Sequence, residues 1–118
     1  MVRVIVLGLA MLALASPASA HARLERASPP VGGQISASPP ELSITFTEGV
    51  EPLFSTIEVR NAKGAEVSTG SPYIVSGDKR QLAIKLPTLS PGTYTVIWHV
   101  TSVDTHKTKG SFKFTVKQ

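Results

Sequence analysis

The sequence contains no cysteine, and its two methionines, Met1 and Met11, both lie near its start. The lack of cysteine excludes disulfide bonds, a cysteine-linked lipid anchor and thiolate metal sites. Beyond residue 20 the chain contains no sulfur atom at all. Any transition-metal site in that part must therefore use histidine, carboxylate, amine or water ligands.

Long apolar runs are also absent after the first 20 residues. A basic start at Arg3, an apolar run from Val4 to Ala15 and small residues up to Ala20 describe a secretory signal peptide. The apolar run is shorter than the roughly 20 residues needed to cross a bilayer. We predict that residues 1–20 are removed after Ala20, and that residues 21–118 form one exported, soluble domain.

Basic residues outnumber acidic ones by 12 to 8, which gives a formal net charge of +4. The lysines and arginines are scattered along the chain, and no basic run alternates with aromatic residues. Because nucleic-acid interfaces concentrate basic charge on one stripe or face, this distribution does not favour a nucleic-acid partner. It is typical of a solvated, mildly basic surface.

Residues 21–118 show no helical periodicity of useful length, but apolar and polar residues alternate in several short segments. Such alternation indicates half-buried β-strands. We expect strands at 22–27, 41–47, 54–60, 81–86, 93–100 and 111–116, a short edge strand at 66–69 and an ambiguous segment at 73–75. The expected core faces carry Leu42, Ile44, Phe46, Ile57, Val59, Tyr94, Val96, Trp98 and Val100. About seven strands separated by Pro- and Gly-rich turns predict an all-β, seven-stranded antiparallel Greek-key sandwich of the Ig-like kind.

His21 would become the first residue of the mature protein. A histidine at a free N-terminus offers a primary amine, with an ordinary pKa of about 8, as well as its imidazole. The amine nitrogen and Nδ1 can close a six-membered chelate ring on one metal ion. Tetragonal sites built from nitrogen and oxygen suit Cu(II) or Ni(II).

A second candidate is Asp104-Thr105-His106, in a loop expected between Thr101 and Lys109. In an extended backbone, residues two apart point to the same side, so both side chains could approach one ion. The alternative is a turn aspartate bonded to its own backbone beside an exposed histidine. His21 and His106 meet only if the first strand and this loop converge at one end of the sandwich. The remaining histidine, His99, is expected on the outer face of its strand.

Glu48 and Glu51 follow the strand expected at 41–47. Either carboxylate could orient a ligand amine or imidazole, and either could be a solvated loop residue. The sequence has no Gly-x-Ser-x-Gly elbow, no cysteine nucleophile and no glycine-rich phosphate loop. No enzymatic activity is therefore predicted.

Several segments resemble CopC-type copper-resistance proteins, in order along residues 21–118. They are His21 after the leader, Ala27-Ser28-Pro29-Pro30, Phe46-Thr47-Glu48, Pro91 to Trp98 and Val103 to Gly110. The resemblance implies a periplasmic copper-binding protein on a seven-stranded, cupredoxin-like β-sandwich. It also implies sequestration of copper and its delivery to an inner-membrane CopD-like transporter.

The resemblance implies that one Cu(II) ion is held by the amine and imidazole of His21 together with Asp104 and His106. Glu48 matches the family's glutamate after the second strand, as a ligand or as a residue that orients one. Some members also have a methionine-rich Cu(I) site between the middle strands. Residues 66–80 contain no methionine, so a Cu(II)-only variant with one ion per mature domain is expected. The protein is also expected to be a monomer.

Two other functions stay open. An N-terminal histidine chelate with a second histidine also describes the copper brace of lytic polysaccharide monooxygenases, which need a flat glycan-binding face with exposed aromatics. The seven aromatic residues here are mostly required for a small core. The other alternative is a metal-free Ig-like accessory module, which would bind Cu(II) no better than a histidine-containing peptide.

Overall fold

The computed structural model describes residues 21–117, so the predicted signal peptide at residues 1–20 lies outside the described residues. The described chain forms eight strands and one 3₁₀ helix, η1. Their bounds are β1 Leu24–Ser28, β2 Gln34–Ile35, β3 Glu41–Phe46, η1 Pro52–Phe54, β4 Thr56–Arg60, β5 Thr69–Val75, β6 Asp78–Lys85, β7 Gly92–Thr101 and β8 Lys107–Val116. No helix in residues 21–117 has the length and apolar character needed to cross a membrane.

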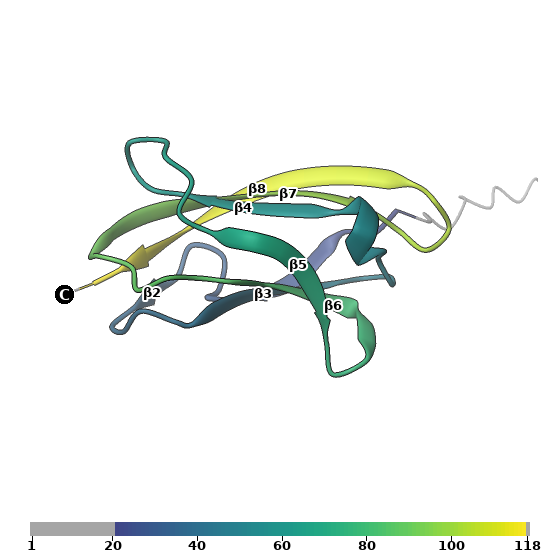
Figure 1. The fold of residues 1–118 in the computed structure, drawn as a ribbon, viewed down its shortest axis with the longest axis horizontal. Helices are drawn as coiled ribbons and strands as arrows, with labels where there is room; N and C mark the ends of the chain where they lie inside the picture. The colour runs from purple at the N-terminus through teal and green to yellow at the C-terminus, as the bar shows by residue number, and fades with distance from the viewer. Residues whose placement is uncertain (1–20, 118) are drawn as a thin grey trace, which may run out of the picture.

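The strands form two four-stranded sheets that pack face to face (Figure 1). One sheet has the order β1-β3-β6-β5 and is antiparallel throughout. The other has the order β2-β8-β7-β4, in which β2 alone runs parallel to its neighbour. The predicted β-sandwich is confirmed, with eight strands instead of seven. The additional strand, β2, has only two residues, too few for an alternation that sequence inspection could detect.

The region between β4 and β6 differs from its prediction. Glu66 forms only an isolated bridge with Arg60, and the strand begins later, at Thr69, so the expected edge strand at 66–69 is wrong. The ambiguous segment at 73–75 is the end of β5. Pro72 interrupts the pairing of β5 with β6, and β5 accommodates it because it is an edge strand.

The last strand begins at Lys107, four residues before the predicted start. Gly110, which we expected to lie in the loop before this strand, is a strand residue opposite Trp98. A Cβ atom at Gly110 would lie 2.4 Å from Cζ2 of Trp98. The glycine therefore marks the place where the indole ring passes over the backbone of β8, because any side chain would collide with it.

The predicted core faces are confirmed. Every residue expected on them is buried, and Phe46 and Trp98 meet edge to face with ring centroids 5.2 Å apart. Tyr94 stacks on Phe114 at 5.5 Å. The whole core cluster lies between Ala22 and Val116. The described residues therefore contain a continuous hydrophobic core that lies between the two sheets.

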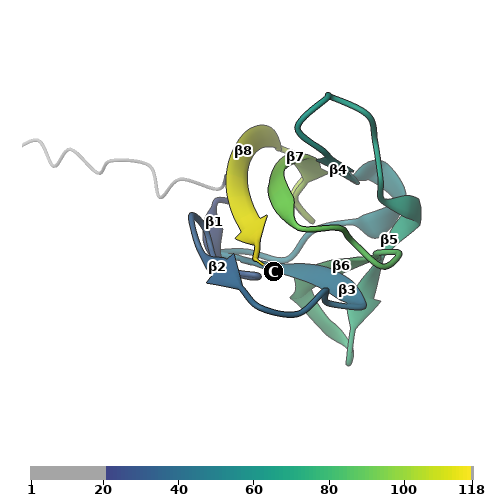
Figure 2. The ribbon, with the colours of Figure 1, turned by 90° about the vertical axis from the view of Figure 1, so that its left-hand side faces the viewer.

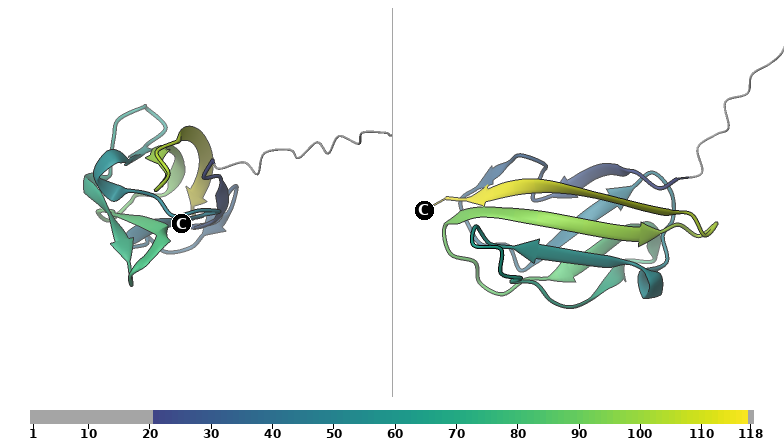
Figure 3. Two further views of the ribbon diagram at one scale, coloured as in Figure 1. Left: turned by 90° about the vertical axis from the view of Figure 1, so that its right-hand side faces the viewer. Right: turned by 90° about the horizontal axis from the view of Figure 1, so that it is seen from above.

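One end of the sandwich gathers segments that are distant in the sequence. The first described residues, η1 and the turn between β7 and β8 all lie at this end (Figures 1 and 3). Figure 2 shows β1 and β8 on the same side of the sandwich although they belong to different sheets. A side-chain hydrogen bond joins β8 to the segment just before β1: Thr108 Oγ1 donates to the carbonyl oxygen of Ala22 at 2.8 Å.

Candidate metal centre

His21 is positioned by the two residues that follow it. Ala22 is completely buried, and its carbonyl accepts the hydrogen bond from Thr108. The backbone N–H of Arg23 donates to Oγ1 of Thr47 at 3.0 Å, and the N–H of Thr47 donates to the carbonyl of Arg23 at 2.8 Å. These contacts fix the backbone at the edges of both sheets, and the His21 side chain remains exposed at the rim.

Residues 102–106 form a tight turn between β7 and β8. The N–H of Ser102 donates to the carbonyl of His106 at 2.8 Å, and the N–H of Thr105 donates to the carbonyl of Ser102, also at 2.8 Å. Thr105 has a φ of 73°, in the left-handed region. The backbone of this turn is therefore not extended, so the rule that residues two apart point to the same side does not apply here. The curvature of the turn brings the two side chains together instead.

Ser102 is completely buried, and its hydroxyl holds this turn from within. Its Oγ donates to Oδ1 of Asp104 and accepts a hydrogen bond from the N–H of His106 at 3.2 Å. Nδ1 of His106 lies 3.2 Å from the same Oδ1 atom. The hydrogen bond from Ser102, and after it the one from His106, lowers the pKa of Asp104 below its usual value. The carboxylate is thus held in its charged form.

The imidazoles of His21 and His106 are in contact. Their ring centroids are 4.9 Å apart and their planes are inclined by 42°. The side chains of His106 and Asp104 retain 50% and 41% of their exposure. The convergence of the first segment and the last turn, on which a joint site depends, is therefore present, and solvent reaches it.

Glu48 is half-buried in the loop after β3. Its neighbours tie this loop to both parts of the candidate site. Thr47 pairs with Arg23, and the carbonyl of Gly49 accepts a hydrogen bond from the N–H of Val103 at 3.0 Å. Glu48 itself makes no hydrogen bond or ion pair with the residues the structure describes. It lies at the same end of the sandwich, between the segment of His21 and the 102–106 turn.

The side chains at this rim are of types that can bind a metal ion, but they are not yet arranged around one point. Within residues 21–117, no three His, Asp or Glu side chains already form a metal-holding group. Oδ1 of Asp104 is directed toward Ser102 and His106. Two adjacent imidazoles and an ionised carboxylate are nevertheless donors that suit a borderline divalent ion such as Cu(II).

Sequence reasoning missed Ser102, because nothing in its neighbourhood marks a serine as buried. His99 was placed correctly. It is exposed on the outer face of β7, between Thr56 of β4 and Lys109 of β8. In this position His99 is separated from the rim where His21 and His106 meet.

The model of the CopC domain family matches residues 24–117. The chain belongs to the CopC domain family. The predicted resemblance is thereby confirmed, and membership of the family supports a copper-related function.

Two relatives illustrate the similarity in sequence. The chain is 42% identical to Protein YobA of Escherichia coli K12 over 99 residues, which cover 83% of this chain and 80% of YobA. It is 36% identical to Copper resistance protein C of Xanthomonas campestris pv. juglandis over 127 residues, covering 96% of this chain and 92% of that protein. The CopC similarity therefore extends over nearly the full length of both chains.

The fold is also similar to that of a solved CopC protein. The crystal structure of CopC from Methylosinus trichosporium OB3b superimposes with a TM-score of 0.78 at 33% sequence identity. The match covers 82% of this chain and 94% of that one. The β-sandwich is thus the CopC architecture.

Proposed function

We propose that this CopC protein binds one Cu(II) ion outside the cytoplasm, through His21, His106 and Asp104. The contact between the two imidazoles, at a centroid separation of 4.9 Å, is the observation that carries the proposal. The two histidines lie at opposite ends of the described sequence, and the fold brings them together at an exposed rim. Copper here is cargo that the protein holds and gives up, and no catalytic step is involved.

The contacts of Asp104 indicate which atoms are available to the metal. Because Nδ1 of His106 faces Oδ1 of Asp104, Nε2 is the imidazole atom we assign to copper. The same carboxylate orients His106, as carboxylates commonly do for histidine ligands. Oδ1 is already bonded to Ser102 and His106, so Oδ2 is the oxygen we assign as the weaker ligand.

The remaining donor is the amine of His21, which exists only after processing. While residues 1–20 are attached, the nitrogen of His21 is an amide without a usable lone pair. Cleavage after Ala20 would create the amine that completes a chelate with Nδ1. We therefore propose that the full donor set forms only after export, so that copper is bound outside the cytoplasm, in the periplasm.

Glu48 is proposed to orient the His21 amine once that amine is free. Its half-buried position on a loop tied to both Arg23 and Val103, and the absence of another partner among residues 21–117, support this role. A carboxylate beside a ligand amine or imidazole fixes its direction and raises its basicity. Glu48 is thus assigned an orienting role instead of direct ligation.

Delivery to a CopD-like inner-membrane transporter is the last step of the proposal. It is supported by the resemblance and by the half-exposed side chains of His106 and Asp104, which a partner could reach without unfolding the domain. Since the imidazoles and the amine must lose protons to bind copper, affinity should fall as the pH drops through the imidazole range. A lower pH would therefore favour release.

The test is a competition titration of the processed protein with Cu(II), with the N-terminus verified by mass. His106→Ala should weaken binding by more than the roughly 10- to 100-fold typical of losing a residue that only orients a ligand. His99→Ala removes an exposed imidazole from the other face and is the matched control, with unchanged affinity. Equal losses in both variants, or none in His106→Ala, would contradict the proposed site.

A further inference from the structure

Most large apolar side chains of the described chain are buried, but Leu53 and Phe54 are neighbours that both project into solvent. Leu53 is 90% exposed and Phe54 is 71% exposed. They occupy η1, the short helix between β3 and β4, and we refer to these two residues as the apolar turn. Two adjacent protruding side chains of this size contribute nothing to the core, so their exposure calls for another explanation.

The backbone of the apolar turn is held firmly. Phe54 N–H donates to the carbonyl of Glu51 at 3.1 Å, and Ser55 Oγ donates to the same carbonyl at 2.7 Å. Thr101, the last residue of β7, donates through Oγ1 to the carbonyl of Phe54 at 3.0 Å and through its N–H to Ser55 Oγ at 3.2 Å. The apolar turn is therefore fixed to the strand that leads into the 102–106 turn.

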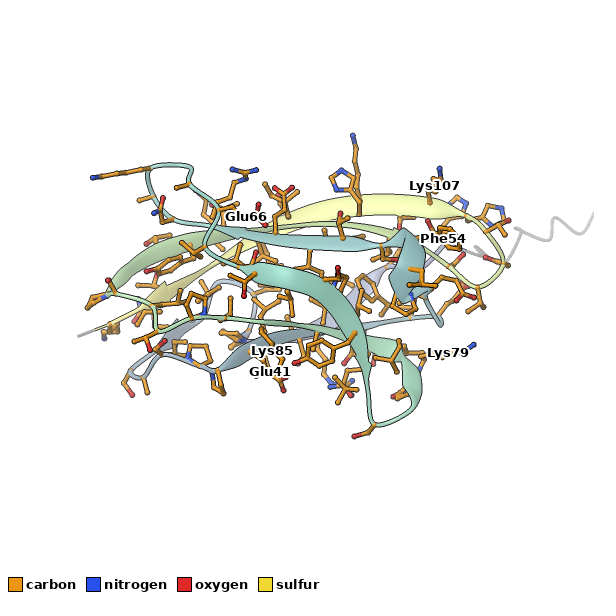
Figure 4. All side chains as sticks on the ribbon, in the orientation of Figure 1. Glu41, Phe54, Glu66, Lys79, Lys85 and Lys107 are labelled. Atoms are coloured by element: carbon orange, nitrogen blue, oxygen red, sulfur yellow. The ribbon has the colours of Figure 1, made fainter. Side chains whose placement is uncertain are left out.

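Basic side chains lie beside Phe54, on one side of the apolar turn, whereas Leu53 lines a second hollow with Glu58 and Glu66. Phe54 shares a shallow hollow with Lys107, Lys109 and His99, which lie on the outer face of β7 and β8. Figure 4 shows Phe54 and Lys107 at the same end of the sandwich. Glu58 is the carboxylate of β4 on this outer face, and Arg60 neutralises it at 2.7 Å. The hollow that Phe54 shares with the two lysines contains no acidic residue.

We propose that the apolar turn and the outer face of β7 and β8 dock onto an anionic lipid bilayer. Leu53 and Phe54 would enter the boundary between headgroups and acyl chains, while Lys107 and Lys109 contact lipid phosphates. Apolar and aromatic tips with lysines beside them form the arrangement by which proteins bind at a membrane interface. Each lysine near an anionic surface adds attraction that falls off within a Debye length.

The local shape favours a bilayer over an acidic protein. Protein interfaces bury broad, complementary patches, whereas this feature is a pair of side chains on a narrow turn with two lysines beside Phe54. Docking in this orientation would bring the 102–106 turn close to the membrane, since Thr101 connects it to the apolar turn. The inference goes beyond the proposed copper binding and does not depend on it.

Sedimentation with lipid vesicles tests the proposal, using the metal-free processed protein. Vesicles of phosphatidylcholine containing phosphatidylglycerol should bind the protein, and vesicles of phosphatidylcholine alone should bind it far less. Substituting Leu53→Ser and Phe54→Ser together should lower the affinity for anionic vesicles by about tenfold or more, because two apolar side chains are no longer transferred from water into the bilayer. Both residues are exposed, so the fold and thermal stability should be retained.

Two sets of control variants distinguish specific docking from nonspecific adsorption to the vesicles. Val31→Ser removes another exposed apolar side chain, 55% exposed, from the turn whose Gly32 is bonded to Lys113, and should leave vesicle binding unchanged. Lys107→Glu with Lys109→Glu should weaken binding strongly, whereas the same charge change at Lys63 and Lys117 should weaken it less. Failure to bind anionic vesicles would overturn the proposal. Equal effects of the charge changes at Lys107 and Lys109 and of those at Lys63 and Lys117 would overturn it as well. Copper titration of the same protein reports separately on the proposed function.

Discussion

The imidazole rings of His21 and His106 lie 4.9 Å apart between centroids, although one precedes the first strand and the other precedes the last. The hydrogen bond from Thr108 Oγ1 to the carbonyl of Ala22 joins two residues that lie close to these histidines in the sequence. Because Ala22 is completely buried, this bond fixes the entry of the chain into the sandwich. The juxtaposition of the histidines is thus a product of the fold and is maintained by packing beneath them.

The buried hydroxyl of Ser102 donates a hydrogen bond to the carboxylate of Asp104. In the folded protein the pKa of Asp104 is lowered, first by the hydrogen bond from Ser102 and then by that from His106. A pKa that is lower in the folded state stabilises the protein at pH values above the unfolded-state pKa. This stabilisation is lost as the pH falls through the folded-state pKa. Ser102→Ala should raise the pKa of Asp104 toward its ordinary value, as measured by NMR titration of the carboxyl carbon. Ser111→Ala, at an exposed position, should leave it unchanged.

Ser102→Ala should also weaken Cu(II) binding. The substitution removes a group that orients both Asp104 and His106, and such losses typically reduce metal affinity by roughly 10- to 100-fold. Competition titration measures the effect, and the pH dependence of binding should shift with the pKa of Asp104. Full affinity in a Ser102→Ala protein with a raised Asp104 pKa would show that this hydroxyl does not act on the metal site.

Gly110 should not tolerate a side chain. A Cβ atom there would lie 2.4 Å from the Trp98 ring, which is packed against Phe46 in the core. Gly110→Ala is therefore expected to lower the free energy of unfolding by about 1–3 kcal/mol, the usual cost of overpacking. Denaturant unfolding measures this, and Ser111→Ala should change it by less than about 0.5 kcal/mol. Equal stability of the two variants would mean that the indole can move aside.

Tyr73 and Glu41 form a pH-sensitive contact between β5 and β3. The phenol of Tyr73 donates to Oε1 of Glu41, and this hydrogen bond is the main cause that raises the pKa of Tyr73 above 10.0. A pKa that is higher in the folded state stabilises the protein at pH values below the unfolded-state pKa. This stabilisation is lost as the pH rises through the folded-state pKa. Glu41→Gln should lower the pKa of Tyr73 in a tyrosinate absorbance titration. Glu25→Gln, which removes a carboxylate bonded to Arg26, should have no effect.

The sequence was sufficient to predict the sandwich and its core faces, because alternation in segments such as Leu42 to Phe46 reports burial directly. It also identified His21, Asp104 and His106 as candidate residues. It could not predict β2, whose two residues are too few to show a period, or the strand role of Gly110, which depends on Trp98. Ser102 was missed because its burial, like the role of Gly110, depends on contacts between segments that are distant in the sequence.

The free amine of His21 is the part of the proposed site that depends on processing, so it provides the most direct test. Cu(II) affinity should be compared by competition titration between processed protein and the same protein carrying one additional alanine before His21. The extension leaves every side chain in place and converts the amine into an amide. We predict a large loss of affinity and an altered Cu(II) EPR spectrum. Unchanged affinity and an unchanged spectrum would contradict the amine chelate.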